Sequence, residues 1–296
     1  MTDSQTKFAG NPVAADAPAI RRLSDIGGAE ITGIDLAQLL RTVQKKAILA
    51  AFLDHHILIF PGQNLDDAAQ LAFTREFGEL EGHVRRLVPG EKPPLVNLVT
   101  NLGSDGKPTQ KPATHGNYHW HTDKSYHAVP SLTTILHAIE IPPSGGDTQF
   151  ANTRRAYDAL PEARKRQIAN MRVVHSWESS RRYTGDAPAT EEEKRDRPPV
   201  THPLVRTHPD TGAKTLYIGS HASHVEGMDY DASRALLESL LEHTVQPQFI
   251  YAHRWRRGDL VMWDNRTLLH RAIANYDMGA QRRVLHRTVV RGTAPF

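Results

Sequence analysis

Short runs of β-branched and aromatic residues, separated by turns rich in Pro and Gly, are the feature that most restricts the fold of this chain. These runs do not alternate regularly with helical segments, which argues against a doubly wound parallel sheet. We therefore expect a mainly β protein with a helical layer, arranged as a β-sandwich or jelly roll. The runs that predict strands cover residues 56–60, 95–99, 132–141, 173–176, 215–218, 248–254, 260–263 and 284–291.

Fewer segments show apolar residues at three- and four-residue spacing, which predicts helices. The predicted helices cover residues 37–54, 66–77, 154–170 and 231–244. Residues 178–199 are dense in charge, Pro, Ser and Thr and contain almost no apolar side chain. We expect this segment to form a surface loop without regular structure, and the alternative is a lid over a site.

The N-terminal sequence is polar and rich in Ala and Pro, so we expect residues 1–18 to form a mobile tail. We expect residues 19–296 to form a single domain, with residues 178–199 as its candidate lid insert. The sequence has no long apolar run and no signal-peptide pattern. It therefore predicts no membrane partner and a cytoplasmic location.

The chain of 296 residues contains 17 His and no Cys. The lack of Cys excludes a disulfide framework, a Cys-based zinc site, an iron–sulfur cluster and a thiol nucleophile. The net charge of +3 is too weak to predict nucleic-acid binding. If the protein binds a metal, His, Asp and Glu must supply its strong side-chain ligands.

The densest group of candidate ligands lies in residues 117–127, which contain a His-x-Asp pair at His121 and Asp123. On a strand, residues two positions apart point to the same face, so this imidazole and carboxylate can converge on one ion. A third ligand from elsewhere would complete a facial triad of two His and one carboxylate, which leaves positions open on iron(II).

Two arginines near the C-terminus, Arg283 and Arg287, lie four positions apart on a predicted strand. They are expected to share one face and to form a cationic wall. A guanidinium group can hold a carboxylate through two parallel hydrogen bonds. The pair therefore indicates a site for an organic acid.

Several motifs in this order give the chain a family resemblance. They are Trp120-His121-Thr122-Asp123, Gly145-Gly146-Asp147-Thr148, Trp263-Asp264-Asn265-Arg266 followed by His270, and the two arginines. With these motifs the chain resembles the iron(II)/2-oxoglutarate-dependent dioxygenases of the TauD/TfdA family over nearly its whole length. Residues 156–161, 221–227 and 253–255 further resemble the branch that acts on 2,4-dichlorophenoxyacetate.

The resemblance implies a double-stranded β-helix (jelly roll) and a set of site residues. His121, Asp123 and His270 would be the catalytic iron ligands. Thr148 and Arg283 would hold the distal carboxylate of 2-oxoglutarate, and Arg287 would lie near both the iron and the acidic group of the substrate. Oxygen would be the second co-substrate, and ascorbate is expected to activate the enzyme in vitro.

The substrate that the resemblance implies is a small organic anion, first of all an aryloxyalkanoate of the phenoxyacetate type. Hydroxylation beside the ether oxygen would cleave it to a phenol and an oxoacid, with succinate and carbon dioxide as co-products. A sulfonate or alkyl sulfate, as in the taurine branch, is the alternative substrate class. We also expect a homo-oligomer.

Four further residues are candidate substrate contacts, each with a structural role as its alternative. Arg86 aligns near a cationic substrate contact of the herbicide branch, and Asn117 matches a contact position of the taurine branch. His221 and His224 form a His-x-x-His pair for which the resemblance favours a pocket role over a second metal. The flanking His119 and His127 are expected to support the site or to lie at the surface.

Two readings from other classes use the same cluster of His and Asp. A non-redox jelly-roll protein would bind zinc or nickel with it, and a zinc hydrolase would use three ligands and one open position. The dinucleotide-binding, P-loop, zincin and nucleophile-elbow motifs do not occur in the sequence.

Overall fold

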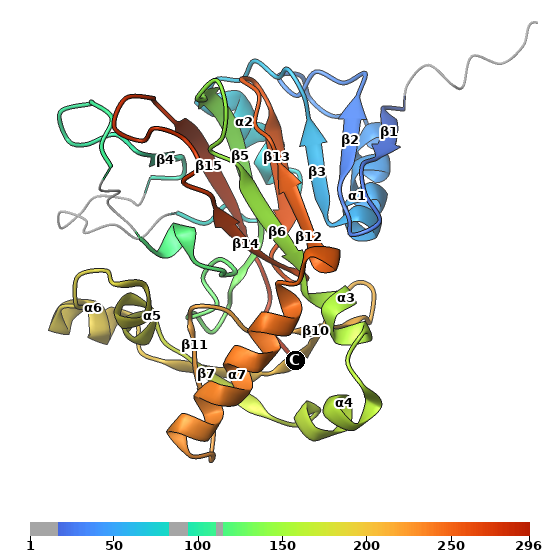
Figure 1. Ribbon diagram of the computed structural model, residues 1–296. Helices are drawn as coiled ribbons and strands as arrows, with labels where there is room; N and C mark the ends of the chain where they lie inside the picture. The colour runs from blue at the N-terminus through green and yellow to red at the C-terminus, as the bar shows by residue number, and fades with distance from the viewer. Residues whose placement is uncertain (1–16, 83–93, 111–114) are drawn as a thin grey trace, which may run out of the picture.

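The computed structural model describes residues 17–82, 94–110 and 115–296. It is a jelly roll in which a large and a small sheet pack face to face (Figure 1), as the sequence predicts. The large sheet has the order β1 (Ala19–Arg22), β2 (Ala29–Thr32), β3 (Ile57–Phe60), β13 (Leu260–Asp264), β5 (Ser131–Glu140), β15 (Val284–Arg291) and β4 (Asn97–Thr100). The small sheet has the order β12 (Ile250–His253), β6 (Thr148–Asn152) and β14 (Leu268–Ala272).

Alternating side chains of the central strands fill two separate cores. On β13, Val261 and Trp263 pack between the two sheets, where Trp263 meets Phe150 of β6 edge-on at 5.4 Å between ring centroids. Leu260 and Met262 of the same strand point to the other face of the large sheet and pack in a second core. A strand buried on both faces reads as a continuous apolar run, which explains why β3 and β13 are recognisable in the sequence.

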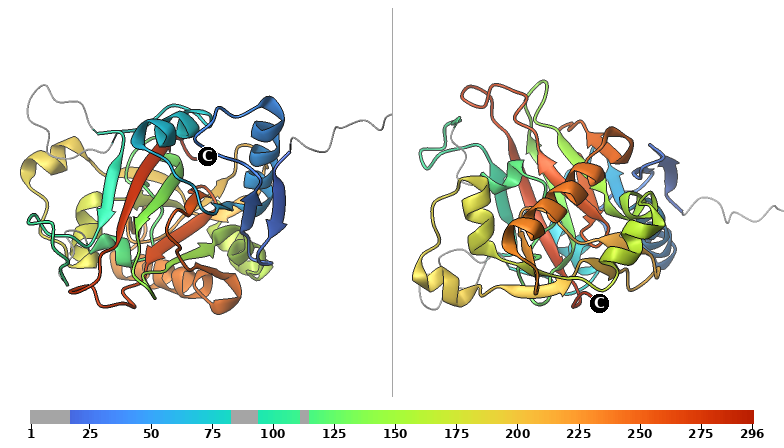
Figure 2. Two further views of the ribbon diagram at one scale, coloured as in Figure 1. Left: turned by 90° about the horizontal axis from the view of Figure 1, so that it is seen from above. Right: turned by 60° about the horizontal axis from the view of Figure 1, so that its bottom comes forward.

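Helices cover the outer faces of both sheets. Two of them, α1 (Thr42–His55) and α2 (Asp67–Arg75), lie against the large sheet, on the side opposite α7 (Tyr230–Thr244) (Figure 2). The small sheet is covered by α7 and α3 (Thr153–Asp158), together with a third sheet. That third sheet has the order β11 (Ala222–Val225), β7 (Arg172–His175) and β8 (Val200–Pro203), and a separate hairpin pairs β9 (Val205–Thr207) with β10 (Lys214–Leu216).

The helix predicted over residues 154–170 is two helices in the structure. α3 ends at Asp158, and α4 (Glu162–Ile168) begins directly after Pro161. Proline has no backbone N–H to donate and disfavours helical geometry in the residue before it, so a single helix cannot pass through this position. The helical periodicity is real on each side, but the break was missed.

The expectation of a loop without regular structure at residues 178–199 is wrong. The segment contains α5 (Trp177–Thr184) and α6 (Glu191–Asp196). The Ser176 side chain caps the start of α5, and Thr190 and Glu193 form a capping box at the start of α6. Local capping therefore stabilises two short helices that have too few apolar residues to show a periodic pattern.

The predicted N-terminal tail lies almost entirely outside the described residues. Within the part that the structure describes, no helix combines the length and the apolar character that crossing a membrane requires. Two short 3-10 helices, η1 (Gly116–Tyr118) and η2 (Pro247–Phe249), complete the regular elements.

Candidate metal and co-substrate site

The side chains of His121 and Asp123, two positions apart, and of the distant His270 converge between the two sheets. One ligand atom each from His121, Asp123 and His270 lies within 4.8 Å of the others, and all three residues are buried. The Nε2 atom of His121 is 3.8 Å from Oδ1 of Asp123, and the ring centroids of His121 and His270 are 4.1 Å apart. This is the arrangement that a facial triad requires.

The backbone brings the triad together in a way that differs from the prediction. His121 and His270 pair with each other in an antiparallel β-bridge through two backbone hydrogen bonds of 3.1 and 2.8 Å. His121 is not part of a longer strand, and the chain turns directly after Asp123, where Lys124 has a φ of 56°. The prediction that His121 and Asp123 lie on a strand is therefore wrong, because His121 forms an isolated bridge and Asp123 begins a turn, but the two side chains do converge as predicted.

The hydrogen bonds and charges of the triad suit a divalent cation. The Nδ1 atom of His121 donates to the carbonyl oxygen of His119 at 2.7 Å, so its Nε2 atom keeps a free lone pair. Burial lowers the pKa of both His121 and His270, which favours neutral imidazoles. Burial alone would raise the pKa of Asp123, but Arg287, the two histidines and Thr134 hold it well below its usual range.

A buried arginine and a threonine form a second polar group beside the triad. The Nε atom of Arg283 donates to the carbonyl oxygen of Gly146 at 2.9 Å, and its Nη2 atom lies 3.4 Å from Oγ1 of Thr148. The Thr148 hydroxyl also accepts a hydrogen bond from Nε1 of Trp255 at 3.0 Å. Arg283 and Thr148 line a narrow cavity together with the three triad residues. A carboxylic acid that reaches the triad would therefore meet the guanidinium group at its far end.

Gly146 makes this close approach possible. Its φ is 71°, in the left-handed region, and a Cβ atom at this position would lie 3.2 Å from Cδ of Arg283. Any other residue here would strain the backbone and press on the Arg283 side chain. The Gly145-Gly146 sequence of the motif thus has a direct structural reason.

Arg287 and Asn117 line both the narrow cavity and a larger one of about 280 Å³ on the other side of the triad. The Nη1 atom of Arg287 is 3.8 Å from Oδ1 of Asp123. His221 also lines the larger cavity, with its Nδ1 atom 3.1 Å from Oγ of Ser125. The structure therefore brings three of the predicted substrate contacts to the triad.

The remaining predicted contacts are not brought together in the same way. His224 lies beside Tyr230 at 6.0 Å between ring centroids, and it is not among the residues that line either cavity at the triad. Arg86 lies outside the described residues. His119 supports His121 through its carbonyl oxygen, and the carbonyl oxygen of His127 lies 3.0 Å from Nε2 of His202.

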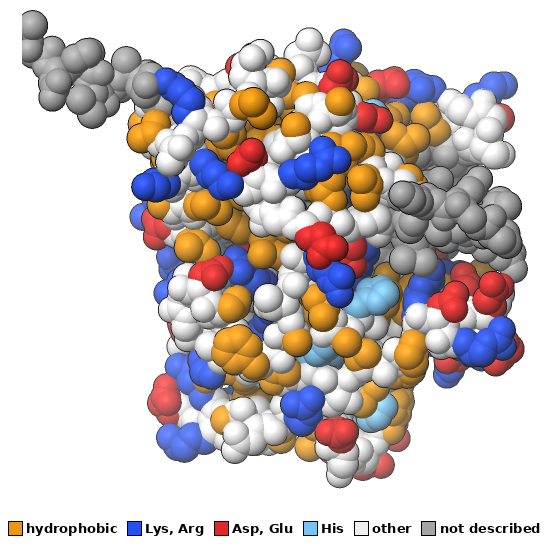
Figure 3. Space-filling view, turned by 180° about the vertical axis from the view of Figure 1, so that it is seen from behind, with side chains coloured by type: hydrophobic (Ala, Val, Ile, Leu, Met, Phe, Trp, Pro, Cys, Tyr) orange, Lys and Arg blue, Asp and Glu red, His pale blue; other side chains and the backbone are white. Residues whose placement is uncertain are grey.

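The roof of the larger cavity comes from α5 and α6. Trp177 lies between the guanidinium groups of Arg181 and Arg197, at 4.7 and 4.3 Å from its ring centroid, and all three line the cavity. Acidic and basic side chains are mixed where α6 lies, at the right edge of Figure 3. These residues were not predicted as site residues, because only the tertiary fold brings them to the cavity beside the triad.

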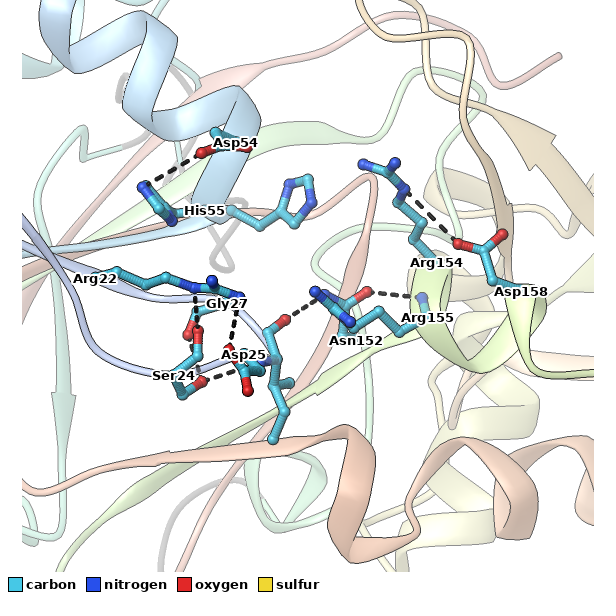
Figure 4. A pocket seen from close by; sticks show the side chains of 12 residues that line it. Arg22, Ser24, Asp25, Gly27, Asp54, His55, Asn152, Arg154, Arg155 and Asp158 are labelled. Atoms are coloured by element: carbon cyan, nitrogen blue, oxygen red, sulfur yellow. Dashed lines mark hydrogen bonds and ion pairs between the residues drawn. The ribbon is translucent and has the colours of Figure 1, made fainter.

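Another cavity lies away from the triad, between α3, the end of α1 and the turn after β1 (Figure 4). It has a volume of about 410 Å³. Its charged side chains are drawn in neighbouring pairs, such as Arg22 with Asp25 at 2.8 Å and Arg154 with Asp158 at 4.0 Å. Basic and acidic groups thus offset each other, and the lining does not favour an ion of either sign.

Known proteins resemble the chain over most of its length. Residues 19–289 match the profile of the taurine catabolism dioxygenase TauD, TfdA family. The α-ketoglutarate-dependent 2,4-dichlorophenoxyacetate dioxygenase of Cupriavidus pinatubonensis is 39% identical over 278 residues, which cover 90% of this chain and 96% of that protein. The (S)-phenoxypropionate/alpha-ketoglutarate-dioxygenase of Sphingobium herbicidovorans is 35% identical over 268 residues, 88% of this chain and 91% of that protein.

A solved structure shows the same fold. The crystal structure of AAD-2 in complex with Mn(II) and N-oxalylglycine superimposes with a TM-score of 0.85 and 38% identity, covering 94% of this chain and 98% of the other. The match in sequence and fold agrees with the buried His-Asp-His group and the adjacent arginine. The chain belongs to the TauD, TfdA family and is a dioxygenase that depends on iron(II) and α-ketoglutarate, which is 2-oxoglutarate.

Proposed function

We propose that the protein hydroxylates a small aryloxyalkanoate, of the phenoxyacetate type, at the carbon beside its ether oxygen. The product is a hemiacetal, which collapses to a phenol and an oxoacid. Succinate and carbon dioxide are formed from 2-oxoglutarate in the same turnover. The names of the relatives that act on 2,4-dichlorophenoxyacetate and (S)-phenoxypropionate support this substrate class.

The single observation that carries the proposal is the lining of the 280 Å³ cavity beside the triad. Aromatic side chains of Tyr126 and Trp177 line it, together with the guanidinium group of Arg287. An aromatic ring packs well against aromatic side chains, whereas a carboxylate needs a cationic hydrogen-bond donor. An aryloxyalkanoate carries both groups within one small molecule.

Each residue of the site has a proposed role. His121, Asp123 and His270 hold the iron, and Thr148 and Arg283 bind the distal carboxylate of 2-oxoglutarate. When bound, the metal and co-substrate would supply the oxidising power: one atom of O2 would enter succinate as 2-oxoglutarate is decarboxylated, and the other would enter the new hydroxyl group of the substrate. The protein itself orients the two acids and excludes water from the triad.

Substrate contacts are proposed for Arg287, Asn117 and His221, and α5–α6 is the proposed lid. Arg287 lies between the two cavities, so its guanidinium group can bind the substrate carboxylate on the side of the triad facing α5. His224 is left out of the proposed site because it does not line the cavity. Arg86 stays a prediction, as do the homo-oligomer, the cytoplasmic location and activation by ascorbate.

A substrate panel tests the proposal. Purified protein with iron(II), ascorbate and 2-oxoglutarate is supplied in turn with phenoxyacetate, taurine and an alkyl sulfate, and succinate and phenol are quantified. We expect phenoxyacetate to give phenol and succinate in equal amounts, and His270→Ala to give neither above background. Faster succinate formation with taurine or the alkyl sulfate than with phenoxyacetate would contradict the proposed substrate class.

A further inference from the structure

The side chain of Thr134 on β5 contacts the carboxylate of the triad. Its hydroxyl forms a short hydrogen bond to Oδ2 of Asp123, and the Thr134 side chain is completely buried. The other carboxylate oxygen, Oδ1, faces Nε2 of His121 and Nη1 of Arg287, each at 3.8 Å. The two carboxylate oxygens of Asp123 therefore have different surroundings: Oδ2 is hydrogen-bonded to β5, and Oδ1 faces the other residues of the candidate site.

Asn265 determines the direction of the Thr134 hydroxyl proton. The Nδ2 atom of Asn265 donates to Oγ1 of Thr134 at 3.0 Å. An amide NH2 group can only donate, so Oγ1 is the acceptor in this bond and must send its own proton elsewhere. The neighbouring Oδ2 of Asp123 is an acceptor, and the two bonds thus form a directed chain from Asn265 through Thr134 to Asp123.

The amide of Asn265 is itself held in one orientation. Its Oδ1 atom accepts a hydrogen bond from Nε1 of Trp263 at 3.0 Å and lies 3.4 Å from the backbone nitrogen of Asp123. An indole N–H only donates, so the oxygen of the amide must face Trp263 and its NH2 group must face Thr134. Asn265 is buried, as are Trp263 and Thr134, so water does not compete for these bonds.

The strands place all members of this chain next to one another. Trp263 of β13 pairs directly with Thr134 of β5, and Asn265 follows at the end of β13. The Thr122 hydroxyl donates to the carbonyl oxygen of Asn265 at 2.7 Å, which ties the His121–Asp123 segment to the same point. Asn265 therefore links β13, β5 and the segment that carries two of the three ligands.

We propose that Thr134 and Asn265 are positioning residues that reserve Oδ2 of Asp123 for the protein and leave Oδ1 to bind the metal through a single oxygen. The proposal rests on the metal role proposed above for the triad. Loss of an outer partner of a ligand typically costs about 10–100-fold in metal affinity. Removal of the Thr134 hydroxyl should thus weaken metal binding without removing any ligand.

The test measures the affinity of the full chain for Mn(II) alone, from the electron paramagnetic resonance signal of the free ion. We expect Thr134→Val to raise the dissociation constant about tenfold or more, and Thr134→Ser to restore it to within about twofold of the wild type. Thr134→Ala is the second variant if the valine protein does not fold. Unchanged Mn(II) affinity in the variant that lacks the hydroxyl, or a loss that Ser does not rescue, would overturn the proposal.

A neighbouring threonine provides the matched control. Thr133 is equally buried on β5, but its hydroxyl donates to the carbonyl oxygen of Trp263 at 2.7 Å and not to a ligand. Thr133→Val should destabilise the fold to a similar degree, as measured by thermal unfolding, and leave Mn(II) affinity within about twofold of the wild type. An equal loss of Mn(II) affinity in Thr133→Val would show a general structural effect and overturn the proposal.

His121→Ala separates this proposal from the metal assignment. If that variant loses Mn(II) binding while Thr134→Val binds as tightly as the wild type, only the roles of Thr134 and Asn265 are overturned. If His121→Ala binds Mn(II) as tightly as the wild type, the ligand assignment is overturned and the positioning roles fall with it.

Discussion

The two sides of the triad are built differently. On the side proposed for the co-substrate, Arg283 and Thr148 belong to the sheets or their immediate ends, are buried and contact each other, and Thr148 also contacts Trp255. On the side proposed for the substrate, α5 and α6 form a roof with ion pairs near the surface, such as Glu178 of α5 with Lys194 of α6 at 3.4 Å. We propose that the sheets fix the shared chemistry, whereas the helical segment α5–α6 adapts the site to one substrate.

The largest effect should come from Arg283, the buried arginine proposed to bind the co-substrate. Arg283→Gln keeps some hydrogen-bonding capacity but loses the charge, and loss of a buried charged partner costs about 2–5 kcal/mol in binding. We expect the KM for 2-oxoglutarate to rise about thirtyfold or more, while the KM for phenoxyacetate changes little. Steady-state kinetics with each substrate varied in turn measures both values.

The adjacent arginine is the control for that variant. Arg282 is 44% exposed and forms an ion pair with Glu140 at 2.6 Å, away from the cavity. Arg282→Gln should leave both KM values within about twofold, since exposed ion pairs contribute about 0–1 kcal/mol. If Arg282→Gln and Arg283→Gln raise the KM for 2-oxoglutarate equally, Arg283 has no specific role in binding the co-substrate.

The large sheet should also lose stability at low pH, because a buried histidine lies at its strand β3. Burial is the main cause that lowers the pKa of His56, at the start of β3, from 6.5 to about 4. The unfolded chain therefore takes up this proton first, and the free energy of unfolding falls as the pH is lowered from 6.5 to about 4. The loss from this group approaches about 3 kcal/mol at the lower end.

His56→Asn removes the titrating group at a position where the backbone is left-handed, with a φ of 62°. Asparagine tolerates this conformation better than most residues do. Urea unfolding at pH 7 and pH 4.5 should therefore show a smaller loss of stability in the variant than in the wild type. Equal losses in both proteins would remove His56 as the cause.

A smaller effect is expected from the aromatic roof. Trp177→Leu keeps an apolar side chain but loses the ring between Arg181 and Arg197. Contacts of this kind contribute about 0.5–2 kcal/mol, so the KM for phenoxyacetate should rise about three- to tenfold with little change for 2-oxoglutarate. A parallel rise in the KM for 2-oxoglutarate would show that the two sides are not independent.

The smallest effect should come from the ion pairs of the roof. Glu178 accepts from Arg182 at 2.7 Å and lies 3.4 Å from Lys194 of α6. Glu178→Gln should change the free energy of unfolding by less than about 1 kcal/mol. We further expect its effect on the KM for phenoxyacetate to shrink as salt is added, because screening weakens the pairs in the wild type as well.

The sequence was most informative where chemistry depends on a few residue types. His121, Asp123 and His270 were predicted as ligands, and the structure places all three together. The apolar runs of β3 and β13 were also found, because strands buried on both faces have an almost unbroken apolar pattern. Neither prediction required knowledge of the loops that connect these segments in the fold.

Other parts of the site depend on contacts that a linear pattern does not contain. β6 and β14 carry Thr148 and His270 into the site and therefore mix polar and apolar residues, so neither was predicted as a strand. Thr134 lies in an ordinary β-type run, and only its pairing with Trp263 shows that it reaches Asp123. The capping box at Thr190 was a local signal that could have revealed α6.

The most direct test of the account follows labelled oxygen during turnover of phenoxyacetate under oxygen-18 gas. Hydroxylation beside the ether oxygen predicts one oxygen-18 atom in succinate for each phenol released, and phenol that keeps the unlabelled oxygen of the substrate. Mass spectrometry of both products measures this. Phenol that contains oxygen-18, or phenol released without labelled succinate, would contradict 2-oxoglutarate-dependent hydroxylation of the carbon beside the ether oxygen.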